Sequence, residues 1–113
     1  MGAGNYNLLI EQGATYDLNL TWKTSDDVLI DLTGYTAKME IRASAELAPI
    51  ITLTNGSGIT LGGVLGTIDI QITATETGAF TAGEYLYDLE LTSGATVTRL
   101  IEGKADVKEQ ITQ

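Results

Sequence analysis

The sequence predicts an all-β fold, either a sandwich or a small barrel, with about eight short strands. Three observations support this prediction. Apolar and polar residues alternate along most of the chain, turn residues recur about every 8–12 residues, and no stretch has helical periodicity over roughly ten residues. At 113 residues, 43% of them hydrophobic, the chain can form one domain with a packed core.

The clearest predicted element is a hairpin over residues 84–103. Its first strand places aromatic and aliphatic residues on one face, and Leu86 interrupts the polar face. Ser93-Gly94 predicts the turn, and residues 95–102 form the return strand. On that strand the alternation places Arg99 on the same face as Val97 and Ile101, so a cation interrupts the apolar face.

The same alternation predicts further strands at 6–11, 14–23, 28–32, 35–43, 50–54, 59–61, 67–73 and 104–108. Asn55-Gly56 predicts a type I′ hairpin turn, because both central positions of that turn need positive φ. The one predicted helical turn lies near residues 75–80, with Thr75 as its cap and Phe80 closing the end of the core.

The two ends of the chain set the predicted limits of the domain. Residues 1–5 are mostly small and are predicted to form a flexible arm, while 109–113 form a tail and 6–108 the single β domain. The N-terminus lacks the basic and apolar segments of a signal peptide, and no run approaches the length of a membrane span. The chain is therefore expected to be made in the cytoplasm.

The composition argues against several classes of function. The absence of histidine and cysteine excludes Ser-His and Cys-His catalytic pairs, thiolate metal sites and disulfides. A formal net charge of −9, from 15 acidic and 6 basic residues, argues against binding to nucleic acid or anionic lipid. Asp26, Asp27 and Asp31 match no calcium-binding spacing and are predicted to be turn residues. Neither an enzyme nor a cofactor is expected.

Two groups of residues are candidates for binding. Glu84, Asp88 and Glu90 share the polar face of a strand, where a basic partner could contact them, although a solvated strand face is the favoured explanation. Trp22 is predicted to be a core residue near a strand end. The alternative is a carbohydrate-binding module, which requires Trp22 or Tyr35 to be exposed as a platform for sugar.

A family resemblance extends over nearly the whole chain. It rests on four segments in order: QGATYDLNLTWK at 12–23, DLTGYTAKMEIR at 31–42, GTIDIQITATETGAF at 66–80, and AGEYLYDLELTSGATVTRLIEGKADVKEQIT at 82–112. This series resembles small structural proteins of tailed-bacteriophage and prophage genomes. Their relatives include the N-terminal domains of baseplate-upper and tail-fibre-attachment proteins.

The resemblance implies an immunoglobulin-like antiparallel β-sandwich of about seven or eight short strands. It also implies a non-enzymatic virion protein that assembles in many symmetric copies by protein–protein contacts. The expected role is a tail, baseplate or fibre-attachment adaptor, with tail, baseplate, fibre or capsid subunits as partners. A capsid decoration (cement) protein is the alternative. The expected location is the virion, after synthesis in the host cytoplasm.

Overall fold

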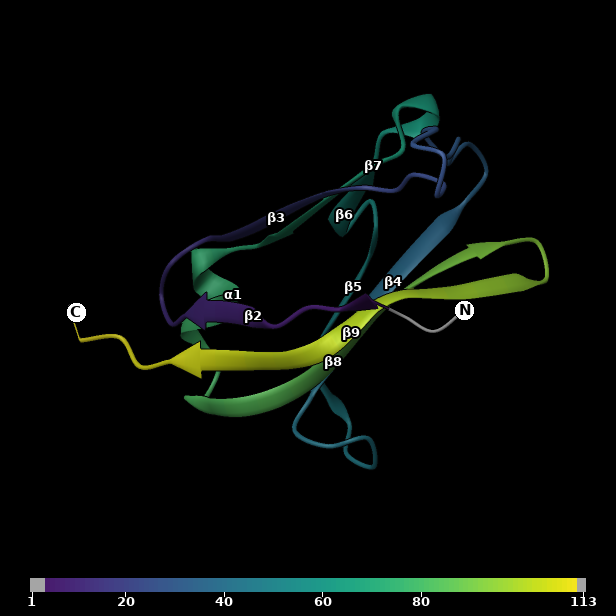
Figure 1. The fold of residues 1–113 in the computed structure, drawn as a ribbon. Coiled ribbons are helices and arrows are strands. Elements are labelled where there is room, and N and C mark those ends of the chain that lie inside the picture. Colours follow the sequence, from purple (N-terminus) through teal and green to yellow (C-terminus); the bar gives the residue numbers. More distant parts are fainter. Residues whose placement is uncertain (1–3, 112–113) are drawn as a thin grey trace.

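Strands dominate the computed structural model, which describes residues 4–111 (Figure 1). Within that range the strands are β1 (Gly4–Asn5), β2 (Leu8–Glu11), β3 (Tyr16–Thr21), β4 (Thr36–Arg42), β5 (Pro49–Asn55), β6 (Gly58–Leu61), β7 (Thr67–Ile72), β8 (Gly83–Ser93) and β9 (Thr96–Lys108). A 3-10 turn, η1 (Gly63–Leu65), and one short helix, α1 (Ala74–Gly78), complete the fold. The predicted all-β class is confirmed.

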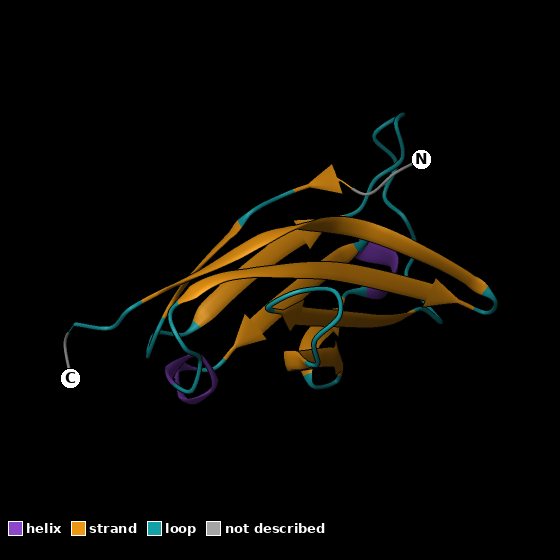
Figure 2. Cartoon of the chain, turned by 90° about the horizontal axis from the view of Figure 1, so that it is seen from below, coloured by secondary structure: helices purple, strands orange, loops and turns teal. Residues whose placement is uncertain are grey.

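The strands form one curled sheet. Its order is β1-β9-β8-β4-β5-β6-β7-β3, and β2 follows β1 along β9 in a parallel pairing. The link between β5 and β6 consists of only two residue pairs, Thr54–Gly58 and Asn55–Ile59. We call β1, β2, β9, β8, β4 and β5 the long-strand group, and β6, β7 and β3 the short-strand group. Figure 2 shows the curl of the strands, with α1 and η1 at opposite ends.

The predicted hairpin is confirmed as β8 and β9, although its details differ. The turn lies at Gly94-Ala95, and β9 continues unbroken to Lys108, so the separate strand predicted at 104–108 is wrong. The register shifts beside Leu89, because Leu89 pairs with Ile101 whereas Glu90 pairs with Arg99. Leu100 is thus the extra residue of a β-bulge, and it puts Arg99 and Ile101 on opposite faces. The prediction that they share a face is therefore wrong.

The N-terminal segment is paired rather than free from Gly4 onward. Gly4 and Asn5 pair with Ile101 and Glu102, which shortens the arm predicted over residues 1–5. Residues 1–3 and 112–113 of the predicted arm and tail lie outside the described residues. β2 begins at Leu8, two residues later than predicted, because the side chain of Asn7 accepts a hydrogen bond from the backbone of Lys104 and interrupts the ladder.

Three other local predictions are wrong. Residues 28–32 form no strand and contribute only an isolated bridge between Leu29 and Lys23. Of Asn55-Gly56, only Gly56 has positive φ, and the flanking strands run parallel, so there is no type I′ hairpin. Thr73 rather than Thr75 caps α1, in a capping box with Glu76.

The core lies inside the curl and receives side chains from both groups. Its inward residues follow the predicted alternation in most strands: Leu18, Ala37, Met39, Ile41, Ile68, Ile70, Ile72, Tyr87, Leu89 and Leu91. Phe80 is buried at one end, as predicted. The buried hydroxyl of Thr77 accepts a hydrogen bond from Gly13 and donates to Ala14, which ties α1 to the loop between the two edge strands β2 and β3.

Candidate interaction surfaces

The outer face of β8 carries the three carboxylates singled out in the sequence. Asp88 and Glu90 lie beside Arg99, at 3.0 Å from its Nε and 3.5 Å from its Nη2 respectively. The bulge at Leu100 brings Arg99 to this face, where alternation alone did not place it. Glu84 lies farther along β8, opposite Asp106. The structure therefore brings Asp88 and Glu90 together but leaves Glu84 apart, and their role as a contact remains a prediction.

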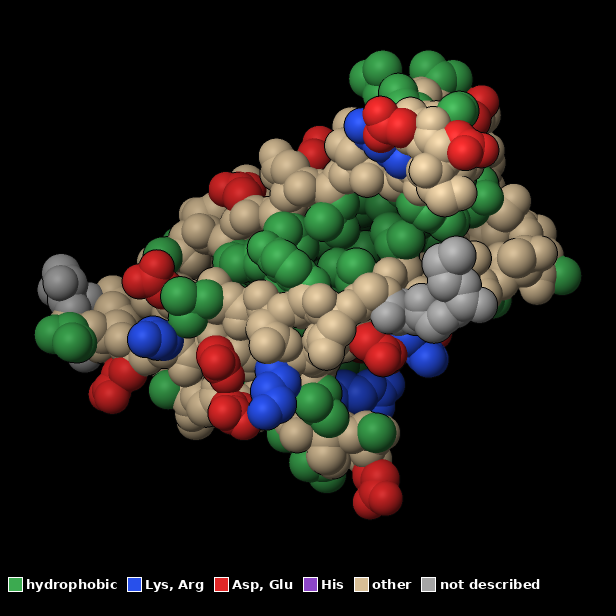
Figure 3. Space-filling view, viewed as in Figure 1, with side chains coloured by type: hydrophobic (Ala, Val, Ile, Leu, Met, Phe, Trp, Pro, Cys, Tyr) green, Lys and Arg blue, Asp and Glu red, His purple; other side chains and the backbone are tan. Residues whose placement is uncertain are grey.

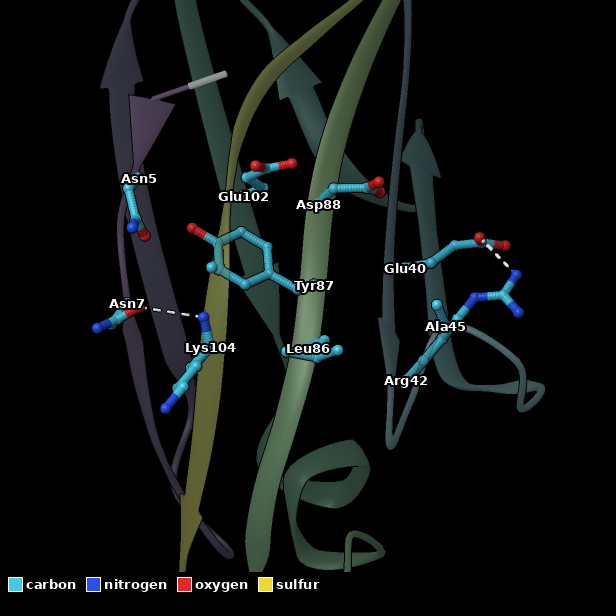
Figure 4. Close-up of a pocket in the computed structure, with 11 residues that line it drawn as sticks. Asn5, Asn7, Glu40, Arg42, Ala45, Leu86, Tyr87, Asp88, Glu102 and Lys104 are labelled. Carbon is cyan, nitrogen blue, oxygen red and sulfur yellow. Dashed lines mark hydrogen bonds and ion pairs between the residues drawn. The ribbon is translucent and has the colours of Figure 1, made fainter. Parts of the chain in front are cut away.

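A shallow groove of about 650 Å³ lies next to this charged face. Figure 4 shows Asn7 and Lys104 on one side of it, Glu40 and Arg42 on the other, and Leu86 between them. Arg42 donates hydrogen bonds to the Glu40 carboxylate at 2.8 Å and to a loop carbonyl at 2.7 Å. The hydrogen bond from Arg42 holds the pKa of Glu40 below its usual value. Glu40, Arg42, Asp88, Glu90 and Arg99 thus have charged partners within the chain.

A second exposed surface has the opposite character. At one end of the molecule, the loop between β3 and β4 meets η1, and four aliphatic side chains point to solvent: Val28 (59% exposed), Leu29 (42%), Val64 (66%) and Leu65 (60%). We call these four residues the apolar tip. Figure 3 shows apolar side chains gathered at this end, beside acidic ones.

Backbone hydrogen bonds hold the base of the apolar tip. Trp22 donates to Gly66, Ile30 to Trp22, and Leu32 to Gly63, at 2.8, 3.0 and 2.8 Å. Gly66 has φ of 67°, and a Cβ added there would lie 2.9 Å from the Trp22 carbonyl oxygen and 3.0 Å from that of Ile30. Only glycine fits this close contact without strain. The two loops are therefore locked together beneath the exposed side chains.

The acidic residues of the tip loop serve its turns. Asp31 accepts two hydrogen bonds from Thr33, at 2.9 Å from the backbone nitrogen and 2.6 Å from the hydroxyl, and they lower the pKa of its carboxyl. Asp27 lies 3.1 Å from Lys23. Within residues 4–111, no group of three or more acidic side chains is placed to hold a metal ion, and no helix is long and apolar enough to cross a membrane.

Trp22 and Tyr35 lie just below the tip. Their rings meet edge to face, with centroids 6.0 Å apart, and both are half-buried against the core. Trp22 lies just after the end of β3, as predicted, but it packs against the core as a half-buried residue and is not one of the buried core residues. In this geometry the edge of one ring covers one face of the other, and the pair packs as a unit against the core.

A third surface is the open edge of β3, which pairs with β7 alone among the described strands. Its inward residue Tyr16 is half-buried, and burial together with the nearby Tyr6 raises the pKa of Tyr16 to about 12. Burial is also the largest cause that raises the pKa of Tyr87, whose hydroxyl donates to the carbonyl of Tyr6. The hydrogen bond places the Tyr87 hydroxyl against the backbone of Tyr6.

Sequence reasoning missed the apolar tip and the open edge. Alternation places Val28 and Leu29 in a strand, and Val64 and Leu65 lie among the glycines of 62–66, where no binding site is predicted. Paired aliphatic residues inside otherwise polar or glycine-rich turns were the available signal, since such positions are rarely buried. The open edge of β3 has no local signal in the sequence, because apolar and polar residues alternate in the same way in an edge strand and in an interior strand.

Comparisons with known proteins identify no relative. No family model matches the chain, and no curated protein matches it. It is similar to a solved structure from photo-crosslinking analyses of multimeric cell-adhesive interactions of VGSC beta subunits, at 11% identity and TM-score 0.48, covering 96% of this chain and 93% of that one. It is also similar to an uncharacterized protein from Bacillus anthracis str. Ames, at 16% identity and TM-score 0.45, covering 95% and 86%. At these TM-scores neither likeness bears on function.

Proposed function

We propose that this chain is a non-enzymatic structural protein of a tailed-bacteriophage particle, located in the tail, baseplate or fibre-attachment region, where it acts through protein–protein contacts. The observation that carries the proposal is the apolar tip. Four aliphatic side chains stand exposed on a base locked by hydrogen bonds, as in a surface that a partner covers.

The energetics of the tip favour this role. Fully burying an exposed valine or leucine side chain is worth about 1.5–3 kcal/mol. The four tip side chains are 42–66% exposed, so a partner that covers them gains part of this value at each. The tip base is preorganised around Gly66, which lowers the entropy lost on binding. The particle assignment itself rests on the resemblance of the strand and turn segments to virion proteins.

We infer further that the two strand groups form the two sheets of an immunoglobulin-like sandwich. The strands divide into a larger and a smaller group, as in that fold. Near the start of β8, the Tyr85 hydroxyl donates to the Thr81 carbonyl at 2.6 Å, which matches the tyrosine corner of immunoglobulin-like domains. An experimental structure with the groups packed face to face, about 10 Å apart, would support this fold, and a closed barrel would contradict it.

The test of function is the copy number of the chain in purified particles. Quantitative mass spectrometry against the major capsid protein gives this number directly. A few copies per particle support the tail or baseplate role. A ratio approaching one per capsid subunit would instead indicate a decoration protein. Absence of the chain from the particle would exclude both virion roles.

A further inference from the structure

β3 presents an open edge with backbone groups pointing outward. It pairs with β7 over six residues, from Tyr16–Ile72 to Thr21–Thr67, and no described strand lies on its other side. Trp22, just after β3, donates its backbone N–H to Gly66 on the β7 side, at 2.8 Å. Because peptide groups alternate in direction along a strand, those of the odd-numbered residues 17, 19 and 21 point to the open edge.

This edge lacks the features that usually prevent pairing with another chain. Between Tyr16 and Thr21 there is no proline, glycine, lysine or register shift, and Asp17 is the only charge. The opposite edge of the sheet is different. There β2 has only four residues and ends at Glu11, and the described chain breaks its pairing between Asn5 and Leu8.

The core is incompletely covered beside β3. Tyr16, Leu20 and Trp22 pack against the core, yet each is only partly buried. Figure 3 shows a hollow lined by apolar side chains between β3 and β2. A strand added along β3 would cover these side chains and satisfy the outward peptide groups together.

We propose that the β3 strand of a second copy occupies this edge, antiparallel and related by a two-fold axis through Asn19. In this register Asp17 lies opposite Thr21 of the second copy, so the two carboxylates are kept apart. On the inward face, Leu18 lies opposite Leu20 and Tyr16 opposite Trp22, so each apolar side chain meets another. A register centred on Asp17 would instead place like charges directly opposite each other.

The self-complementary pattern is what favours a second copy as the occupant. A two-fold interface needs one patch that matches itself, and β3 does so at every position from Tyr16 to Trp22. The charge of −9 on each copy opposes association. Because salt screens this repulsion, the dimer is expected to strengthen as ionic strength rises above about 0.15 M.

Sedimentation equilibrium of the purified chain tests the dimer. The wild type is expected to dimerise, and Asn19→Asp, which puts two carboxylates on the axis, should raise Kd at least about tenfold. Thr54→Asp is the matched control, because it adds the same charge at an exposed strand position opposite Lys38. A wild type that stays monomeric in high salt would overturn the proposal, as would a dimer equally weakened by both variants or by neither.

Cross-linking tests the register. The chain has no cysteine, so Asn19→Cys introduces a single thiol that meets its own copy across the axis at a Cα separation of about 5.5 Å, within disulfide reach. Mild oxidation should give a covalent dimer far faster than with Thr54→Cys. Equal rates for the two variants would overturn the proposed pairing. Neither experiment depends on the chain's place in a particle, so this proposal can fail while the proposed function stands.

Discussion

Two exposed surfaces can be compared, the charged outer face of β8 and β9 and the apolar tip. They differ in whether their side chains have interaction partners within the chain. On the outer face, Arg99 lies within 4.0 Å of Asp88, Glu90 and Glu102, and Arg42 within 2.8 Å of Glu40. At the tip, Val64 and Leu65 are 66% and 60% exposed.

The difference shows that net charge is a poor guide to where this molecule meets others. The acidic balance of −9 draws attention to the carboxylates, but Asp88 and Glu90 of β8 and Glu40 of β4 lie beside cations of the same chain. Exposed ion pairs contribute little to stability or binding, about 0–1 kcal/mol. Exposed aliphatic side chains on a rigid base have more to gain from a partner.

The largest expected effect on the free energy of unfolding comes from replacing leucine by alanine in the core, compared with the same replacement at the tip. Leu89→Ala removes a side chain that is 0% exposed, and it should lower the free energy of unfolding by about 2–5 kcal/mol. Leu65→Ala at the tip should change it by no more than about 0.5 kcal/mol. Urea unfolding followed by tryptophan fluorescence measures both. Similar losses for the two variants would mean that the tip is part of the core.

A second effect tests whether the base of the tip is rigid. Gly66→Ala puts a methyl group against two carbonyl oxygens at positive φ, and it should destabilise the fold by about 2–4 kcal/mol. Gly56→Ala is the control, because Gly56 also has positive φ but nothing lies within 4 Å of the added methyl. It should lose only about 1–2 kcal/mol. Equal losses of unfolding free energy for the two variants, in thermal or urea unfolding, would show that the loops move apart to accommodate the methyl group at Gly66.

A smaller effect is expected on the outer face. Arg99→Gln removes the cation between Asp88 and Glu90, whose side chains are 36% and 34% exposed. The expected loss is about 1 kcal/mol or less, and it should shrink in about 1 M salt, where exposed charges are screened. Urea unfolding at low and high salt measures it. A large loss that salt does not change would mean that the ion pairs form a structural network.

The smallest effect concerns pH. Because Arg42 holds the pKa of Glu40 below its unfolded-state value, the stabilisation is present above the unfolded-state pKa and is lost as the pH falls through the folded-state pKa. In Arg42→Gln, the pKa of Glu40 should rise toward its usual value, as NMR titration of the side-chain carboxyl would show. An unchanged Glu40 pKa would mean that another group holds it down.

Alternation predicted most of the strands and their inward residues. The inward residues of β4 and β7, and the hairpin of β8 and β9, follow the period of the sequence. Alternation failed at Leu100. One extra residue in β9 reverses which face of the sheet the following side chains occupy, and nothing in the local composition indicates it. Alternation also failed at residues 28–32, where an aliphatic run resembles a strand but pairs only at Leu29.

The candidate surfaces were less predictable than the strands. The carboxylates of β8 were found because charges stand out in a sequence, whereas their pairing with Arg99 depends on the bulge in the partner strand. The tip depends on a meeting of two loops more than 30 residues apart, Val28 with Leu29 and Val64 with Leu65, which no local pattern encodes. Whether β3 is an edge strand depends on the order of the strands in the sheet, which its own sequence does not specify.

The most direct test of the central claim is the incorporation of variants into particles made in cells that lack the wild-type chain. Leu65→Asp places a charge on the apolar tip, and Asp88→Asn changes the outer face by one charge. Both should fold, with unchanged circular dichroism. Leu65→Asp is expected to be missing from purified particles, while Asp88→Asn is present at the wild-type copy number. Incorporation of Leu65→Asp at the wild-type copy number would mean that the apolar tip is not the contact surface.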